Sequence, residues 1–193
     1  MLVMKEKFKR MRANNMGGLQ LNFDENKKIY PKGEVFFKLT DSKTGEILEQ
    51  HKYNVITDAA SVLIARLFKD NTEPLHGAYC LAVGTGDSGW DLQDPPAATA
   101  AQTALESELT RKVFSSTNFI TSLGAVSPTP TNIVDFSSTF TESEAVGPLV
   151  EMGIFGGDST LVPNSGSLVN YLTFKVINKS NTSILNIVWR LTF

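Results

Sequence analysis

The chain has 193 residues, of which 41% are hydrophobic and 20% are charged, and its formal net charge is −2. This size and composition are typical of one globular domain, and the near balance of charges excludes a general electrostatic attraction to nucleic acid or anionic membranes. Cys80 is the only cysteine, which excludes a disulfide within the chain, and no apolar run is long enough to predict a membrane span.

Residues 1–34 are predicted to form an extended amino-terminal arm. Residues 14–18 (NNMGG) and 31–33 (PKG) interrupt any regular period, although residues 19–23 (LQLNF) alternate like a short edge strand. Five basic residues cluster near the start of the arm and are its predicted interface residues: Lys5, Lys7, Lys9, Arg10 and Arg12. We expect the arm to become ordered on a partner, with a disordered terminus as the alternative. No apolar stretch follows the basic cluster, so we expect no secretory signal.

The folded domain is predicted to span residues 35–193 and to begin with a hairpin. Val35, Phe37 and Leu39 alternate with other residues up to a turn at residues 41–45 (DSKTG), whose aspartate and glycine suit a tight loop. The return strand is expected over residues 46–55. His51 lies in this alternating strand, and we interpret it as a surface or interface side chain.

One amphipathic helix is predicted directly after the hairpin. Thr57 and Asp58 are typical of a helix cap. The apolar residues behind them are spaced to form one stripe on a helix of about three turns, and they are Ala60, Leu63, Ile64, Leu67 and Phe68. We expect this stripe to share a core with the last strand of the chain, so that Leu63 and Leu67 pack with Trp189 and Leu191.

Short strands separated by turns are predicted over the rest of the chain. They are expected at about 79–84, 111–120, 132–141, 149–155, 168–177 and 184–193. A loop at residues 84–104 follows the first of them, and Leu105 and Leu109 suggest a short helix after it. In the last strand five apolar residues fall on one face, which is predicted to be buried: Leu185, Ile187, Trp189, Leu191 and Phe193. This pattern predicts a mainly β fold, an antiparallel β-sandwich with one packed amphipathic helix and an extended N-terminal arm.

The 84–104 loop contains a motif that imitates two kinds of enzyme site. Residues 84–89 (GTGDSG) have the glycine spacing of a dinucleotide-binding turn, but the paired prolines at 95–96 exclude the helix that must follow. The same residues imitate the nucleophile loop of trypsin-like proteases around Ser88. That chemistry needs a histidine base, and the chain after Ser88 is too long for that fold. We therefore interpret the motif as a tight turn.

Other chemically reactive side chains do not form a predicted catalytic or metal site. Two histidines and one cysteine lack the spacing of zinc ligands. Asp87, Asp91 and Asp94 lack the pattern of a calcium loop. Glu142 and Glu144 flank a turn, where exposed acids are common. We expect no catalytic residue, no metal and no cofactor, and Trp90 is the candidate for an exposed loop contact.

Several segments occur in an order that characterises a known group of proteins. They are residues 53–67 (YNVITDAASVLIARL), 81–86 (LAVGTG), 103–111 (TALESELTR), 149–155 (LVEMGIF) and 187–193 (IVWRLTF). In this order and spacing they resemble small structural proteins of tailed bacteriophages, which are found among tail, baseplate, fibre and capsid accessory components. The resemblance covers about residues 53–193 and brings no catalytic residue with it.

The resemblance implies a non-enzymatic virion structural protein, a tail, baseplate or fibre-attachment component that assembles through protein–protein contacts. One alternative is a capsid cement (decoration) protein that stabilises the head shell. Another is a host-glycan binding module in which Trp90 and Tyr79 stack on a sugar. The expected partners are other virion proteins and copies of the chain itself, with no small-molecule substrate and no membrane. Packaged DNA is a disfavoured partner for the five cations of the arm. The expected location is the virion, after synthesis in the host cytoplasm.

Overall fold

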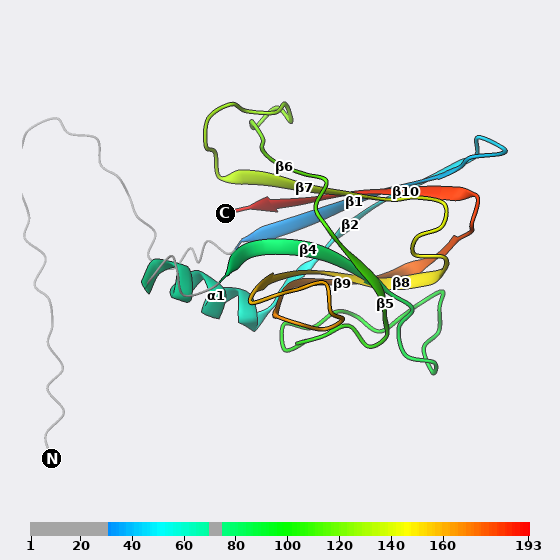
Figure 1. Cartoon of the computed structure of the whole chain (residues 1–193), viewed down its shortest axis with the longest axis horizontal. Coiled ribbons are helices and arrows are strands. Elements are labelled where there is room, and N and C mark those ends of the chain that lie inside the picture. Colours follow the sequence, from blue (N-terminus) through cyan, green and yellow to red (C-terminus); the bar gives the residue numbers. More distant parts are fainter. Residues whose placement is uncertain (1–30, 70–74) are drawn as a thin grey trace, which may run out of the picture.

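The described residues fold as two five-stranded antiparallel sheets and one helix. Figure 1 shows the two sheets as stacked layers, with the helix at one end. The computed structural model describes residues 31–69 and 75–193. The mainly β fold and the antiparallel sandwich that the sequence predicted are therefore confirmed. The basic cluster of the predicted arm lies outside the described residues.

Sheet A has the strand order β2-β1-β10-β7-β6. Its strands are β1 (Lys32–Asp41), β2 (Ile47–Tyr53), β6 (Ser116–Phe119), β7 (Ile133–Phe140) and β10 (Ser183–Thr192). The β1–β2 hairpin turns as predicted, because Asp41 Oδ1 accepts the backbone N–H groups of Lys43 and Thr44, both at 2.8 Å. Gly45 adopts a left-handed φ of 74°, which a residue with a Cβ rarely adopts. Strand β1 begins at Lys32, three residues before the predicted start of the domain.

Sheet B has the strand order β3-β9-β8-β4-β5. Its strands are β3 (Val55–Ile56), β4 (His76–Gly84), β5 (Glu108–Val113), β8 (Gly147–Gly157) and β9 (Ser167–Lys179). The prediction of one strand at about 111–120 is wrong, because this segment forms two strands in different sheets. The chain leaves sheet B after β5 and joins sheet A as β6. The short helix suggested near Leu105 and Leu109 is also wrong, because Leu109 already lies in strand β5.

The main core lies between the two sheets and confirms the predicted face of the last strand. Leu185, Ile187, Trp189 and Leu191 are all buried in it. The indole N–H of Trp189 donates a hydrogen bond to Asn54 Oδ1 at 3.1 Å, so the polar atom of this buried ring has a partner. Phe193 was predicted on the same face, but it lies beyond the end of β10 and is half exposed.

Helix α1 (Asp58–Lys69) packs against β9 at one end of the sandwich. The Thr57 hydroxyl donates to the carbonyl oxygens of Leu168 and Val169 in β9, so this side chain anchors the start of the helix to the sheet. Of the predicted stripe, Ala60 and Leu63 are buried, whereas Ile64 and Leu67 are 37% and 38% exposed. The prediction that Leu63 and Leu67 pack in one core with Trp189 and Leu191 is therefore wrong, since neither belongs to the main core that holds those two residues. The helix meets the sandwich along only one side of its apolar stripe. No helix in the described ranges is long and apolar enough to cross a membrane.

Candidate interaction face

The outer face of sheet B is covered by loops, which build a second, smaller core over it. This cluster is formed by Cys80, Ala82, Leu105, Phe155, Leu168 and Tyr171. Two buried charged residues, Glu151 and Arg111, hold the covering loops in place. The outer face of sheet B is consequently occupied by the chain itself.

Glu151 organises the glycine motif at the end of β4. Its carboxylate accepts backbone N–H groups from Gly86 at 3.1 Å, Glu106 at 2.9 Å and Ser107 at 2.8 Å, and the Tyr171 hydroxyl at 2.7 Å. These bonds hold residues 106 and 107 in a bent, non-helical segment just before β5, where the sequence suggested a helix. Burial and the adjacent Glu151 carboxylate raise the pKa of the Tyr171 hydroxyl well above its usual value.

Arg111 holds the loop between β8 and β9. Its guanidinium pairs with Glu108 at 2.6 Å, and both side chains are 1% exposed. It also donates to the carbonyl oxygens of Thr160 at 3.0 Å and Ser165 at 3.1 Å, and it lies over the Phe155 ring at 4.2 Å. Sequence reasoning missed both Arg111 and Glu151, because isolated charges in strands give no periodic signal that they are buried.

The outer face of sheet A, in contrast, leaves most of its side chains exposed or only partly buried, with Asp135 of β7 as a buried exception. We define this face by the residues that the strand register places on it. They are Glu34, Phe36, Lys38, Glu49, His51, Tyr53, Asn186, Val188 and Arg190. His51 is on the surface, as the sequence predicted.

The aromatic side chains on this face stack across neighbouring strands. The rings of Phe36 and His51 lie parallel, with centroids 4.5 Å apart and planes 5° apart. His51 also packs on Tyr53, with centroids 5.1 Å apart, and its Nε2 lies 3.0 Å from Glu34 Oε2. Tyr53 is 72% exposed. The face thus offers a large aromatic surface whose inner members are already held in position.

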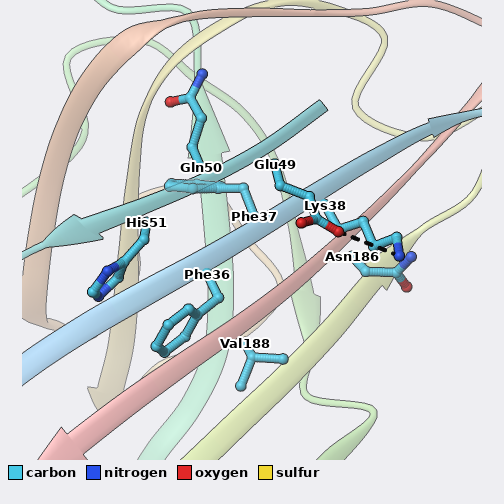
Figure 2. A pocket seen from close by; sticks show the side chains of 8 residues that line it. All are labelled: Phe36, Phe37, Lys38, Glu49, Gln50, His51, Asn186 and Val188. Atoms are coloured by element: carbon cyan, nitrogen blue, oxygen red, sulfur yellow. Dashed lines mark ion pairs between the residues drawn. The ribbon is translucent and has the colours of Figure 1, made fainter. Parts of the chain in front are cut away.

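Charged and polar side chains frame the aromatic residues. Arg190 makes a two-point ion pair with Asp135, at 2.7 Å and 2.8 Å, and its guanidinium lies 5.8 Å from the centre of the Phe36 ring. Lys38 pairs with Glu49 at 3.4 Å. A shallow hollow of about 530 Å³ lies among these side chains. Figure 2 shows Phe36, His51 and Val188 on one side of the sheet, with Gln50 pointing to the other side.

Strand β2 forms one edge of sheet A, directly beside this face. Nearly all of its side chains are exposed, including the large apolar residues Ile47 and Leu48. An edge strand carries backbone N–H and C=O groups that are free to pair with another chain. Sheet A therefore presents an accessible side-chain surface and a seven-residue edge next to each other.

The structure also places Trp90, the predicted loop contact. Its side chain is only partly buried, and its ring packs on Gly86, so closely that a Cβ at residue 86 would lie 2.5 Å from a ring carbon. Gly86 has a left-handed φ of 69°. Tyr79 stacks on His76, with ring centroids 4.1 Å apart. Trp90 follows the Gly84 end of β4, and Tyr79 lies about 17 Å back along that strand, so the two rings do not form one surface.

The residues that imitate catalytic groups either lie far apart or accept backbone hydrogen bonds within turns. His76 and Gly84 are at opposite ends of β4, about 26 Å apart at the usual rise per residue, and His51 lies in the other sheet. Asp87 and Asp91 accept the backbone N–H groups of residues two positions later, at 2.7 Å and 2.9 Å. Within the described ranges, no group of three or more His, Cys, Asp or Glu side chains is placed to hold a metal ion.

The acidic pair that flanks the β7–β8 turn carries pKa shifts opposite to those of a general acid. Hydrogen bonds from Lys112 and from the Thr141 backbone lower the pKa of Glu144 to about 2. Hydrogen bonds from its own backbone N–H and from the Ser42 hydroxyl lower the pKa of Glu142. Both carboxylates are therefore ionised anchors of the turn.

No family model matches the chain, and no curated protein is significantly similar to it. The outer face of sheet A, together with edge strand β2, is the arrangement in the described residues best suited to contact another macromolecule.

Proposed function

We propose that this protein is a non-enzymatic structural subunit of a tailed bacteriophage virion, a tail, baseplate or fibre-attachment component that assembles through protein–protein contacts. The observation that carries the assembly role is the exposed aromatic and charged face of sheet A, bordered by the open edge of β2. The virion context comes from the resemblance of residues 53–193 to small phage structural proteins.

The composition of the face supports a protein partner. Tryptophan, tyrosine and arginine supply most of the binding energy at protein interfaces, and aromatic residues in general are enriched there. Here Tyr53 is exposed, and Arg190 and Phe36 are already held by Asp135 and His51. Side chains that are ordered before binding lose less conformational entropy when the complex forms. The ion pair of Lys38 with Glu49 supplies the polar rim that such interfaces have.

Edge strand β2 adds a second mode of contact. A neighbouring strand that pairs with β2 extends sheet A by main-chain hydrogen bonds. When the neighbour is another copy in a closed ring, each subunit receives the same contact, and many modest contacts add up around the ring. This mechanism needs geometry and buried area, and it uses no reactive side chain.

Mass spectrometry of purified phage particles from the source of this gene tests the proposal. We expect the chain to be present in fixed stoichiometry with known virion proteins, and to be found with tails after tails and capsids are separated. Recovery with empty capsids instead would assign it to the head as a cement protein. Absence from carefully purified particles contradicts the proposed function.

A further inference from the structure

A small apolar cavity lies between helix α1 and the open end of the sandwich. Its volume is about 140 Å³, and its lining comes from α1, from four strands and from both ends of the described domain. The helix contributes Ala60, Leu63, Ile64 and Leu67, and the domain ends contribute Pro31 and Phe193. Ile64, Leu67 and Phe193 are all partly exposed, so they form the apolar mouth of the cavity.

Asn170 of β9 is the one residue in this lining with a polar side chain. It is 0% exposed, and neither its Oδ1 nor its Nδ2 atom has a hydrogen-bond partner. A buried amide without partners costs free energy in the folded chain. The other lining side chains offer no polar atom, so a water placed there would lack the two to four partners that buried waters have.

The two unpaired atoms of Asn170 define the chemistry of the missing partner. A planar amide with one free acceptor and free donors matches another amide, and in proteins the most common amide is the peptide group of an extended chain. The cavity is close in size to the cavity of about 150 Å³ that holds one benzene ring. It therefore has room for one large apolar side chain beside that peptide group.

We propose that the cavity receives the alternating apolar segment at residues 19–23 from a second copy of this chain, with Asn170 pairing to its backbone. Pro31, the residue that follows the undescribed segment 1–30, itself lines the cavity. Residues 1–30 therefore join the domain beside this cavity. Residues 19–23 lie eight to twelve residues before Pro31, so they reach up to about 26–40 Å from it, far enough for the same cavity of a second copy that lies alongside. Leu19, Leu21 and Phe23 supply apolar side chains of suitable size. This inference rests on the proposed function in assembly and names one of its contacts.

Two full-length variants test the exchange by analytical ultracentrifugation. The first, Asn170→Leu, removes the unpaired amide with little change in size. The second replaces Leu19, Leu21 and Phe23 with Ser, and its matched control replaces Met4, Met11 and Met16 with Ser. We expect Asn170→Leu and the triple variant of Leu19, Leu21 and Phe23 each to weaken self-association at least tenfold. The methionine control should self-associate like the wild type. An equimolar mixture of the two defective variants should associate, because intact segments from one meet intact cavities in the other.

The melting temperature of dilute, dissociated protein provides the second measurement. Asn170→Leu should melt at the same or a higher temperature, since it replaces an unsatisfied polar group with an apolar one. A lower melting temperature would mean that Asn170 has a structural partner, and it would overturn the inference. A monomeric wild type whose melting temperature falls with the arm substitution would show that the segment binds its own domain, which also overturns it.

The proposed function and this inference fail in different ways. A protein that is present in particles and an Asn170→Leu variant that associates like wild type together reject the cavity contact and leave the structural role standing. A protein that is absent from particles but loses self-association in the Asn170→Leu variant rejects the virion role and leaves the cavity contact standing.

Discussion

The two outer faces of the sandwich show how one fold separates stability from recognition. On sheet B, loops cover the face, and Glu151 and Arg111 become buried charges with several hydrogen-bond partners each. On sheet A, the side chains of the Arg190–Asp135 pair keep more contact with water than those of the Arg111–Glu108 pair, and Arg190 lies near the partly buried ring of Phe36. Buried polar groups stabilise only when all their partners are present, whereas exposed groups keep most of their hydration. We therefore expect substitutions on sheet B to affect folding and substitutions on sheet A to affect assembly.

The largest difference is expected between the two arginine–carboxylate pairs, one on each face. Arg111→Met leaves Glu108 buried without its partner, and it should destabilise the protein by about 3–5 kcal/mol. Arg190→Met should cost only about 1 kcal/mol, because Arg190 and Asp135 are 26% and 12% exposed and water replaces part of the lost interaction. Chemical denaturation of both variants measures the two values. Equal losses of unfolding free energy in the two variants would mean that the arginine–carboxylate pairs of the two faces contribute equally to stability.

A second comparison uses the two glutamates, again one on each face. Glu151→Gln keeps the shape of the side chain but points an amide donor at backbone N–H donors, and it should cost about 2 kcal/mol. Glu49→Gln, on the exposed face, should change the free energy of unfolding by less than about 0.5 kcal/mol. Hydrogen exchange would locate the effect, since the amides of residues 86, 106 and 107 should lose protection only in Glu151→Gln. Unchanged protection there would contradict the assigned role of this carboxylate.

Assembly should respond to the face of sheet A without a change in folding. Tyr53→Arg places a charge on the exposed aromatic surface, and it should weaken self-association or incorporation into particles about tenfold, which corresponds to about 1.4 kcal/mol. Its matched control is Leu161→Arg, since Leu161 is 55% exposed and lies in the loop that covers sheet B. Both variants should unfold at the wild-type denaturant concentration. A control that weakens assembly as much as Tyr53→Arg would remove the distinction between the faces.

The smallest effect is expected from the ion pair that joins the two sheets. Lys112 of β5 bonds to Glu144 at 2.7 Å and to the Thr139 carbonyl of β7 at 3.1 Å. Because the folded-state pKa of Glu144 is lowered from 4.5 to about 2, the stability it contributes is present above about pH 4.5 and is lost as the pH falls towards 2. Glu144 is 37% exposed, so water screens the pair and the contribution should be under about 1 kcal/mol.

Denaturation of wild type and Glu144→Gln across this pH range measures the effect. The two proteins should differ at pH 7 and converge near pH 2. A difference that stays constant down to pH 2 would mean that Glu144 contributes nothing through its charge.

Several elements follow from the sequence alone, because their signals are local. The alternation of apolar residues in β10 predicts a strand with one buried face, since side chains alternate every two residues in any strand. Asp41 and Gly45 predict the hairpin turn, because one accepts nearby N–H groups and the other adopts positive φ. His51 is recognisable as a surface side chain because it lies in a strand whose side chains alternate between the two faces of the sheet. These residues depend only on neighbours a few positions away.

Tertiary structure decided the rest, because the partners are far apart in the chain. Glu151 meets Gly86, Glu106 and Tyr171 only after β4, β8 and β9 have paired. The stripe of α1 predicts an apolar surface, but only the docking of the helix on β9 buries Leu63 and leaves Leu67 exposed. Asn170 resembles any polar residue in a strand until the sheets enclose it without a partner. Local periodicity determines which side of an element is apolar, whereas burial and pairing depend on which distant segments fold against it.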